Sequence, residues 1–302
     1  MYAPIRFRWI IPWPGIAVAI LLACSMLGAG TTAAGTKHAA AETVRPTAVA
    51  VRPFPVFDGL LYLGKPDLRP QGLVPIVWIG DLWGPGVSKE TVDEVRVRSE
   101  FERIRNSGGL YYLDIENWPV LSVSGTTRRQ NIEKLTRVID LARHAAPHAQ
   151  LGFYGILPGI TYWPLFRHDA EYRDWLDGNR ALDPLAGHVD AIFPSLYTYY
   201  DDLEGWKNYA RQTLSEARRY GKPVYVFLWP QFHDSNPDLR GKELPRAFWR
   251  SELDLCAQMA DGIVLWGGWQ GQWDERASWW QEVLAFMKTL ENGSGAVDPA
   301  GS

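Results

Sequence analysis

The sequence predicts an α/β fold, a TIM-like (β/α) barrel, on three observations. Short apolar strands alternate with amphipathic helices through most of the 302 residues, and such alternation builds a parallel sheet covered by helices. The strands are continuously hydrophobic, as expected where both faces of a sheet are buried. No glycine-rich phosphate fingerprint follows the first clear strand, which disfavours an open, doubly wound sheet.

The apolar runs give the strands of this barrel in order. Six runs are clear, and GLLYLG adds a candidate seventh, so we expect a distorted barrel with seven strands. The expected strands are 59–64, 73–81, 110–114, 150–157, 190–197, 223–229 and 262–267.

Helices are expected between these strands. Thr127 should be an N-cap, because Gln130 follows three residues later in the capping-box pattern. The helix at 203–220 shows the clearest helical spacing and stops at Gly221, just before Pro223. Its apolar stripe is Trp206, Tyr209, Ala210, Thr213, Leu214 and Ala217. Further helices are expected at 90–108, after Pro245 and near 278–290.

The two ends of the chain differ from its middle. Residues 1–41 resemble a signal peptide and a small-residue linker, because Arg6 and Arg8 precede the short apolar run GIAVAILLACSML. This run is short for a membrane span of about 20 residues, so we expect an exported protein, with an uncleaved anchor as the alternative. LLAC also resembles a lipoprotein signal, which would lipidate Cys24. We expect one domain over 52–290 and a disordered tail over 291–302.

Composition narrows the class of ligand. The net charge of −3 gives no basic footprint for nucleic acid. Of the two cysteines, Cys24 lies in the signal region, which leaves Cys256 without an internal partner. Aromatic content is high, with 15 Trp and 13 Tyr; most of the Trp should be core, but a cluster beside carboxylates would suit the flat apolar faces of sugars. We expect no metal and no cofactor.

In a β/α barrel, the chemistry lies at the C-terminal ends of the strands. Here these positions carry carboxylates, tyrosines and tryptophans, but no lysine, which suits a neutral polyol or sugar. They are Asp81, Trp83, Asp114, Glu116, Trp118, Tyr154, Ser195, Tyr197, Trp229, His233, Asp234, Trp266 and Trp269. For Trp118, Trp229, Trp266 and Trp269, packing and sugar stacking are equally open at this point.

Asp114 and Glu116 are the best candidates for chemistry. They stand two residues apart, so on a strand their side chains project in the same direction. Two carboxyls this close do not both ionise cheaply, so the pKa of one should rise and leave an acid near neutral pH. Such an acid can protonate a glycosidic oxygen. The alternative is that the pair only caps the strand end.

Four segments in order resemble the hyaluronidase family of glycoside hydrolases. They are LYYLDIENWP, LGFYGILPG, DAIFPSLYTYY and DGIVLWGGW, which lie between about residue 108 and residue 270. The resemblance implies a distorted β/α barrel that cleaves glycans by a retaining mechanism, in which the acetamido group of the substrate is the nucleophile. Two departures from the family concern the substrate: Ile115 stands where the family usually has Trp, and the family's disulfide cysteines are missing.

Carried over by position, the resemblance gives each residue a role. Glu116 is the general acid and then the general base, and Asp114 holds Glu116 and orients the substrate. Tyr197 positions the acetamido group, and Tyr154 and Trp266 line the sugar subsite. The other expected substrate-binding residues are Trp229, Trp118, Asp81 and Trp269.

Other interpretations stay open or fall away at this stage. The chain could be a non-catalytic carbohydrate-binding barrel, or a glycosidase of other specificity in which Asp81 or Asp234 is a second catalytic carboxylate. His233 and Asp234 could belong to a Ser-His-Asp catalytic triad only with a suitably placed serine. Ser195 lacks the Gly-x-Ser-x-Gly elbow of such a nucleophile, so this interpretation is rejected.

Overall fold

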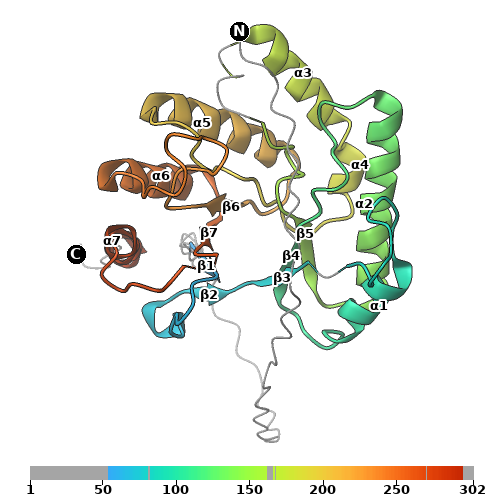
Figure 1. The fold of residues 1–302 in the computed structure, drawn as a ribbon, viewed down its shortest axis with the longest axis horizontal. Helices are drawn as coiled ribbons and strands as arrows, with labels where there is room; N and C mark the ends of the chain where they lie inside the picture. The colour runs from blue at the N-terminus through green and yellow to red at the C-terminus, as the bar shows by residue number, and fades with distance from the viewer. Residues whose placement is uncertain (1–53, 81, 162–165, 167, 270, 295–302) are drawn as a thin grey trace, which may run out of the picture. The chain divides into compact units, whose positions relative to one another are not determined.

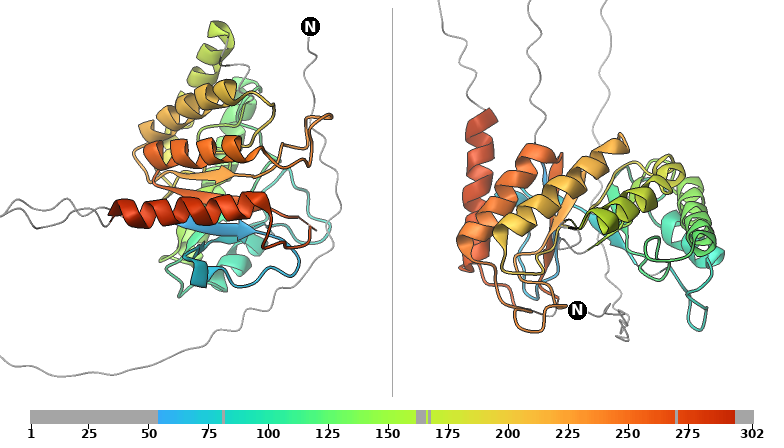
Figure 2. Two further views of the ribbon diagram at one scale, coloured as in Figure 1. Left: turned by 90° about the vertical axis from the view of Figure 1, so that its left-hand side faces the viewer. Right: turned by 90° about the horizontal axis from the view of Figure 1, so that it is seen from above.

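A computed structural model describes residues 54–80, 82–161, 166, 168–269 and 271–294 (Figure 1). All of them belong to one compact unit. Parallel strands form its centre and helices lie outside them, as Figures 1 and 2 show. The predicted α/β barrel class is therefore confirmed, while the expected signal peptide lies outside the described residues.

The strands form two parallel sheets. In the first, the order is β2 (Val74–Pro75), β1 (Val56–Leu60), β7 (Gly262–Gly267) and β6 (Tyr225–Leu228). In the second, β3 (Val77–Ile79) pairs with β4 (Leu110–Leu113), which pairs with β5 (Gln150–Phe153). The predicted strand at 59–64 is thus present but displaced: it runs from Val56 to Leu60 and overlaps the predicted range only at its end.

Isolated bridges and one shared run connect the two sheets. Residues 192–195 form parallel bridges to Tyr154, after β5, and to Val224 and Phe227 at β6. On the other side, β2 and β3 lie in the run 74–79, which pairs first with β1 and then with β4. The pairing path therefore visits seven parallel segments and returns to β1.

Two predicted strands differ from the expectation because of proline. The segment 190–197 holds only single bridges, and Pro194 has no N–H to give to a ladder. The run 73–81 divides into β2 and β3 at the point where Pro75 stands and the pairing partner changes. Both segments keep their predicted place in the order of the barrel.

Helices cover most of the outside of the strands. Helices α5 (Leu203–Arg219), α6 (Arg246–Met259) and α7 (Ser278–Ser294) lie side by side on one flank (Figure 2). On another flank α1 (Glu94–Glu102) packs against α2 (Gly125–Ala145). None of the helices in the described part of the chain has the length and hydropathy of a membrane-crossing segment.

The helix ends correct two expectations. The N-cap of α2 is Ser124, whose hydroxyl accepts the Thr127 N–H at 3.1 Å, so Thr127 lies inside the first turn instead of capping it. The stretch 158–184, where no helix was expected, contains α3 (Asp169–Arg180) and the short α4 (Asp183–Ala186). Only three residues of α3 are buried, so its apolar spacing is weak in the sequence.

Aromatic rings fill the inside of the barrel. The rings of Tyr112 on β4 and Phe227 on β6 lie 4.8 Å apart, although these strands are not neighbours. Phe193 touches both rings, and Phe57 on β1 touches Tyr225 on β6. The interior is therefore a packed core, and a ligand can reach the barrel only at its ends.

Candidate functional site

The carboxylate pair lies where β4 ends. Tyr112 points into the barrel, and Asp114 follows it two residues later, directly after the strand. Glu116 lies close enough for its charge to act on Asp114. Ile115, between them, is buried. The chain then turns at Glu116 and Asn117, which leaves the Glu116 side chain exposed while Asp114 is half-buried.

Burial gives this pair unusual acid–base properties. Oδ1 of Asp114 is enclosed and has no hydrogen-bond partner among the described residues. Removal from water and, secondly, the charge of Glu116 raise the pKa of Asp114 to about 7. Partial removal from water also raises the pKa of Glu116. The pair therefore retains a proton close to neutral pH, mainly because of burial and only secondarily because of the repulsion that its spacing predicts.

Five rings gather beside the pair and are called the aromatic cluster: Tyr154, Tyr197, Trp229, His233 and Trp266. Tyr197 is its centre. Its ring stacks on Trp266 at 5.5 Å between centroids and 28°, and on His233 at 6.0 Å. Tyr154 and Trp229 lie 5.8 and 5.6 Å away.

The carboxylate pair and the aromatic cluster belong to one site. Burial is the main cause of the raised pKa values of Tyr154 and Tyr197, but the charge of Asp114 raises both further. Such an effect requires the carboxyl group to be near both phenols. The Tyr154 hydroxyl also donates to Ser195 Oγ at 3.1 Å. Residues that are far apart in the sequence thus meet where the strands end.

Glycines let the last strand pass close to these rings. A Cβ on Gly267, whose φ is 137°, would stand 2.7 Å from Cδ1 of Trp229. A Cβ on Gly268, at φ 79°, would stand 2.2 Å from the Tyr62 ring. The two glycines of LWGGW therefore allow the backbone to contact Trp229 and Tyr62 directly.

The structure distinguishes the four tryptophans for which the sequence left packing and sugar stacking equally open. Trp118 is 1% exposed, its indole N–H donates to the Lys89 carbonyl at 2.8 Å, and its ring packs on Trp83. Its expected role in substrate binding is therefore wrong, because the turn after Glu116 directs it into packing. Trp229 and Trp266 lie in the aromatic cluster, and Trp269 is 48% exposed.

The remaining candidate site residues are the two reserve carboxylates, Asp81 and Asp234. Asp81 lies outside the described residues. Asp234 is exposed, although partial removal from water raises its pKa. The sequence analysis did not identify Tyr112 as a site residue. It stands two positions before Asp114, and the charge of Asp114 adds to the effect of burial in raising the pKa of Tyr112. Within the described ranges, no group of three or more His, Cys, Asp or Glu side chains could hold a metal ion.

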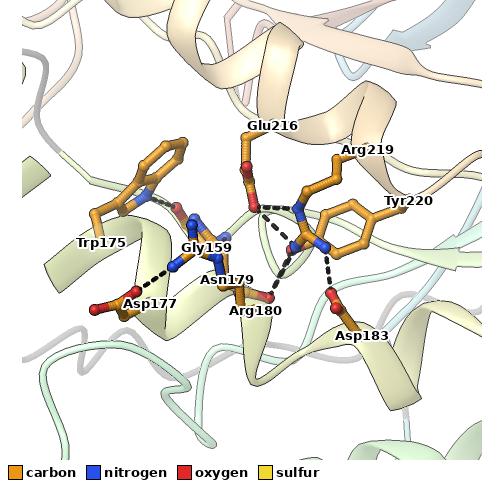
Figure 3. A network of polar contacts seen from close by, with 9 residues as sticks. All are labelled: Gly159, Trp175, Asp177, Asn179, Arg180, Asp183, Glu216, Arg219 and Tyr220. Carbon is orange, nitrogen blue, oxygen red and sulfur yellow. Dashed lines mark hydrogen bonds and ion pairs between the residues drawn. The ribbon is translucent and has the colours of Figure 1, made fainter. Parts of the chain in front are cut away.

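A polar network holds the loop that follows Tyr154 (Figure 3). Gly159 of this loop donates its N–H to Asn179 Oδ1 at 2.9 Å, and its carbonyl accepts the Trp175 indole N–H at 3.0 Å. The carbonyl of Asn179 accepts from Arg219 and Tyr220 of the α5 end. Helix α3, which the sequence did not predict, therefore holds the loop that follows Tyr154.

Comparisons with known proteins agree on the fold. The structure is similar to the crystal structure of bee venom hyaluronidase, with a TM-score of 0.55 and 14% identity over 79% of this chain and 97% of that chain. It is also similar to bee venom hyaluronidase in complex with a hyaluronic acid tetramer, with a TM-score of 0.54 and 15% identity over 79% and 96% of the two chains. No protein-family description matches the sequence. No curated protein matches it either. At this level of identity the likeness concerns the fold, so the chain shares the barrel of bee venom hyaluronidase.

Proposed function

We propose that this protein is an exported glycoside hydrolase that cleaves a glycan containing N-acetylhexosamine with retention of configuration. Glu116 is the acid and base, and the acetamido group of the substrate is the nucleophile. The observation that carries the proposal is the Asp114–Glu116 pair, which keeps a proton near neutral pH beside the aromatic cluster. The barrel shared with bee venom hyaluronidase is consistent with this chemistry.

The first step breaks the glycosidic bond. Glu116 gives its proton to the glycosidic oxygen, and the leaving sugar departs as an alcohol. The acetamido carbonyl oxygen attacks the anomeric carbon from the opposite face and closes a cyclic oxazolinium ion. Tyr197 holds the acetamido group in place for this attack. Asp114 lies beside Glu116, and its negative charge offsets the positive charge on the ring nitrogen.

The second step restores the enzyme. The Glu116 carboxylate takes a proton from water, and the hydroxide oxygen attacks the anomeric carbon on the face that the leaving group vacated. The ring opens, the acetamido group re-forms, and Glu116 is protonated again. Two inversions at one carbon give net retention.

A competing mechanism has one observation in its favour. Asp234 follows His233 of the aromatic cluster, and burial raises its pKa. If Asp234 were a nucleophile or base, the enzyme would act on sugars without an acetamido group. The substrates that the enzyme accepts therefore separate the two mechanisms.

The test compares purified wild type with Glu116→Gln on glycans with and without acetamido groups. Gln keeps the shape of the side chain but has no proton to give, so we expect a rate loss of about 10²–10⁴-fold. Glu133→Gln, on an exposed position of α2, is the matched control and should cleave at the wild-type rate.

Three results would contradict the proposal. Cleavage of sugars that lack an acetamido group would exclude substrate assistance. Equal cleavage by wild type and Glu116→Gln would remove Glu116 from the mechanism. Equal binding by both proteins without any cleavage would make the chain a carbohydrate-binding barrel.

The proposal of export rests on residues 1–41 of the sequence, where two arginines precede a short apolar run. N-terminal sequencing of the protein recovered from the producing cell tests it. We expect a start after one of the small-residue stretches TAA (32–34) or AAA (39–41). Recovery of the intact N-terminus in the cytoplasm would contradict export, and a lipid on Cys24 would identify a lipoprotein.

A further inference from the structure

His233 belongs to the aromatic cluster but has no role in the chemistry proposed above. Its backbone N–H donates to the Thr198 carbonyl at 2.8 Å, and Phe232 forms a bridge with Thr198. The chain after β6 is thereby tied to the segment that carries Tyr197. His233 is thus fixed by its backbone within the site.

The hydrogen bonds of the imidazole define its tautomer. The backbone N–H of Ser235 donates to Nδ1 of His233 at 3.1 Å, and Ser235 Oγ lies 2.8 Å from the same atom. Because a backbone N–H can only donate, Nδ1 must accept, and the neutral ring carries its proton on Nε2. Burial lowers the pKa of His233 to about 4, so the ring is neutral under ordinary conditions.

The Nε2–H group is an unused donor inside the site. It has no hydrogen-bond partner among the residues that the structure describes. The ring lies 4.6 Å from Tyr199, 5.9 Å from Trp229 and 6.0 Å from Tyr197, measured between ring centroids. The acidic groups near this cluster are Asp114, whose charge reaches Tyr197, and Asp234, the next residue in the chain.

A neutral N–H in such surroundings selects for uncharged ligands. It can donate to a hydroxyl or to an amide carbonyl without any change of charge. A carboxylate at the same place would receive no compensating positive charge and would be repelled by Asp114 and Glu116 in their ionised state. The site therefore favours neutral sugar units over uronic acids.

We propose that His233 is a substrate-specificity residue, whose Nε2–H donates a hydrogen bond to a hydroxyl or acetamido oxygen of a neutral N-acetylhexosamine unit bound beside the aromatic cluster. This inference rests on the proposed function for the class of sugar. The inference adds that His233 recognises the sugar and that uronic acid units are excluded from this position.

The experiment measures binding in a Glu116→Gln background, where the ligand is not cleaved. The two probes are a neutral N-acetylglucosamine tetrasaccharide and a tetrasaccharide in which N-acetylglucosamine alternates with glucuronic acid. We expect the neutral probe to bind more tightly. His233→Phe keeps an aromatic ring without the donor and should weaken binding of the neutral probe about tenfold. His233→Gln keeps an N–H donor and should stay within about threefold of the parent.

Folding is checked by the thermal unfolding midpoint of each variant. If both variants unfold early, binding of the two probes by the Glu116→Gln parent at pH 7 still decides the preference for neutral sugar. The inference is overturned if His233→Phe binds the neutral probe as tightly as the parent, if the acidic probe binds more tightly, or if the neutral probe does not bind. Cleavage by wild type with unchanged His233→Phe binding would refute only this inference. If binding by the variants is as expected but wild type cleaves neither probe, only the proposed function is refuted.

Discussion

Glu252 of α6 accepts a hydrogen bond from the hydroxyl of Thr198, and both side chains are completely buried. Burial raises the pKa of Glu252 well above its ordinary value, so the carboxyl is neutral in the folded protein. Its other oxygen has no hydrogen-bond partner among the described residues. Thr198 directly follows Tyr197 and also holds the backbone of His233, so this buried acid supports the wall of the site.

The raised pKa of Glu252 should make folding stability depend on pH. In the unfolded chain Glu252 loses its proton above its ordinary pKa, while the folded protein keeps it. Its contribution is therefore fully present at low pH and is lost as pH rises, by up to about 1.4 kcal/mol per pH unit. We expect the free energy of unfolding of Glu252→Gln, measured by urea denaturation from pH 5 to pH 8, to fall less steeply than that of wild type. Parallel curves would show that Glu252 is ionised in the folded state.

Asp114→Asn tests whether the two carboxyls act as a pair. Wild type should lose activity as pH rises above about 7, because the pair then loses its last proton. In Asp114→Asn the group with the pKa of about 7 is gone. The last proton is then that of Glu116, whose pKa is raised only by partial removal from water, so the alkaline limb of the pH–rate profile should move to lower pH. The maximal rate should fall about 10²-fold. An unchanged alkaline limb would mean that Asp114 does not control the proton on Glu116.

The sequence was sufficient for the features that depend on local pattern. The strand LYYL and helix α5 appear where their apolar spacing predicts them, and the sequence places Asp114 directly after that strand. Strand pairing was harder, since a run such as 73–81 shows no sign that it changes partner midway. Periodicity reports burial, but it does not report which neighbour receives each hydrogen bond.

The direction of side chains beyond the end of a strand also could not be predicted from the sequence. Trp118 and Trp266 both stand near the end of an apolar strand in the sequence. The turn at Glu116 and Asn117 nevertheless directs the Trp118 side chain into the buried core. The state of His233 depends on the Ser235 N–H and on burial by distant rings. Neither contact is encoded in a motif, because each depends on how separate segments meet.

Gly267→Ala should disturb the site more than an ordinary glycine substitution. The new Cβ would combine an unfavourable φ with a 2.7 Å contact to Trp229, so we expect a loss of about 2–4 kcal/mol in unfolding free energy. Trp229 must also move, which should raise KM. Gly221→Ala is the matched control, because it has φ 68° but open space around its Cβ. It should cost about 1 kcal/mol and leave KM unchanged. Equal effects of the two substitutions would show that the contact with Trp229 relaxes freely.

Asn179→Ala tests the support of the loop after Tyr154 (Figure 3). The substitution leaves the N–H of Gly159 buried without its acceptor, which should lower the free energy of unfolding by about 1–3 kcal/mol. Asp177→Ala lies two residues away on the same helix and removes only an exposed ion pair with Arg180, so its effect should stay within about 0.5 kcal/mol. Urea denaturation of both variants gives the comparison, and hydrogen exchange at Gly159 should accelerate in Asn179→Ala alone. Equal protection of Gly159 in the two variants would mean that the Trp175 contact holds the loop without Asn179, because that bond to the Gly159 carbonyl survives both substitutions.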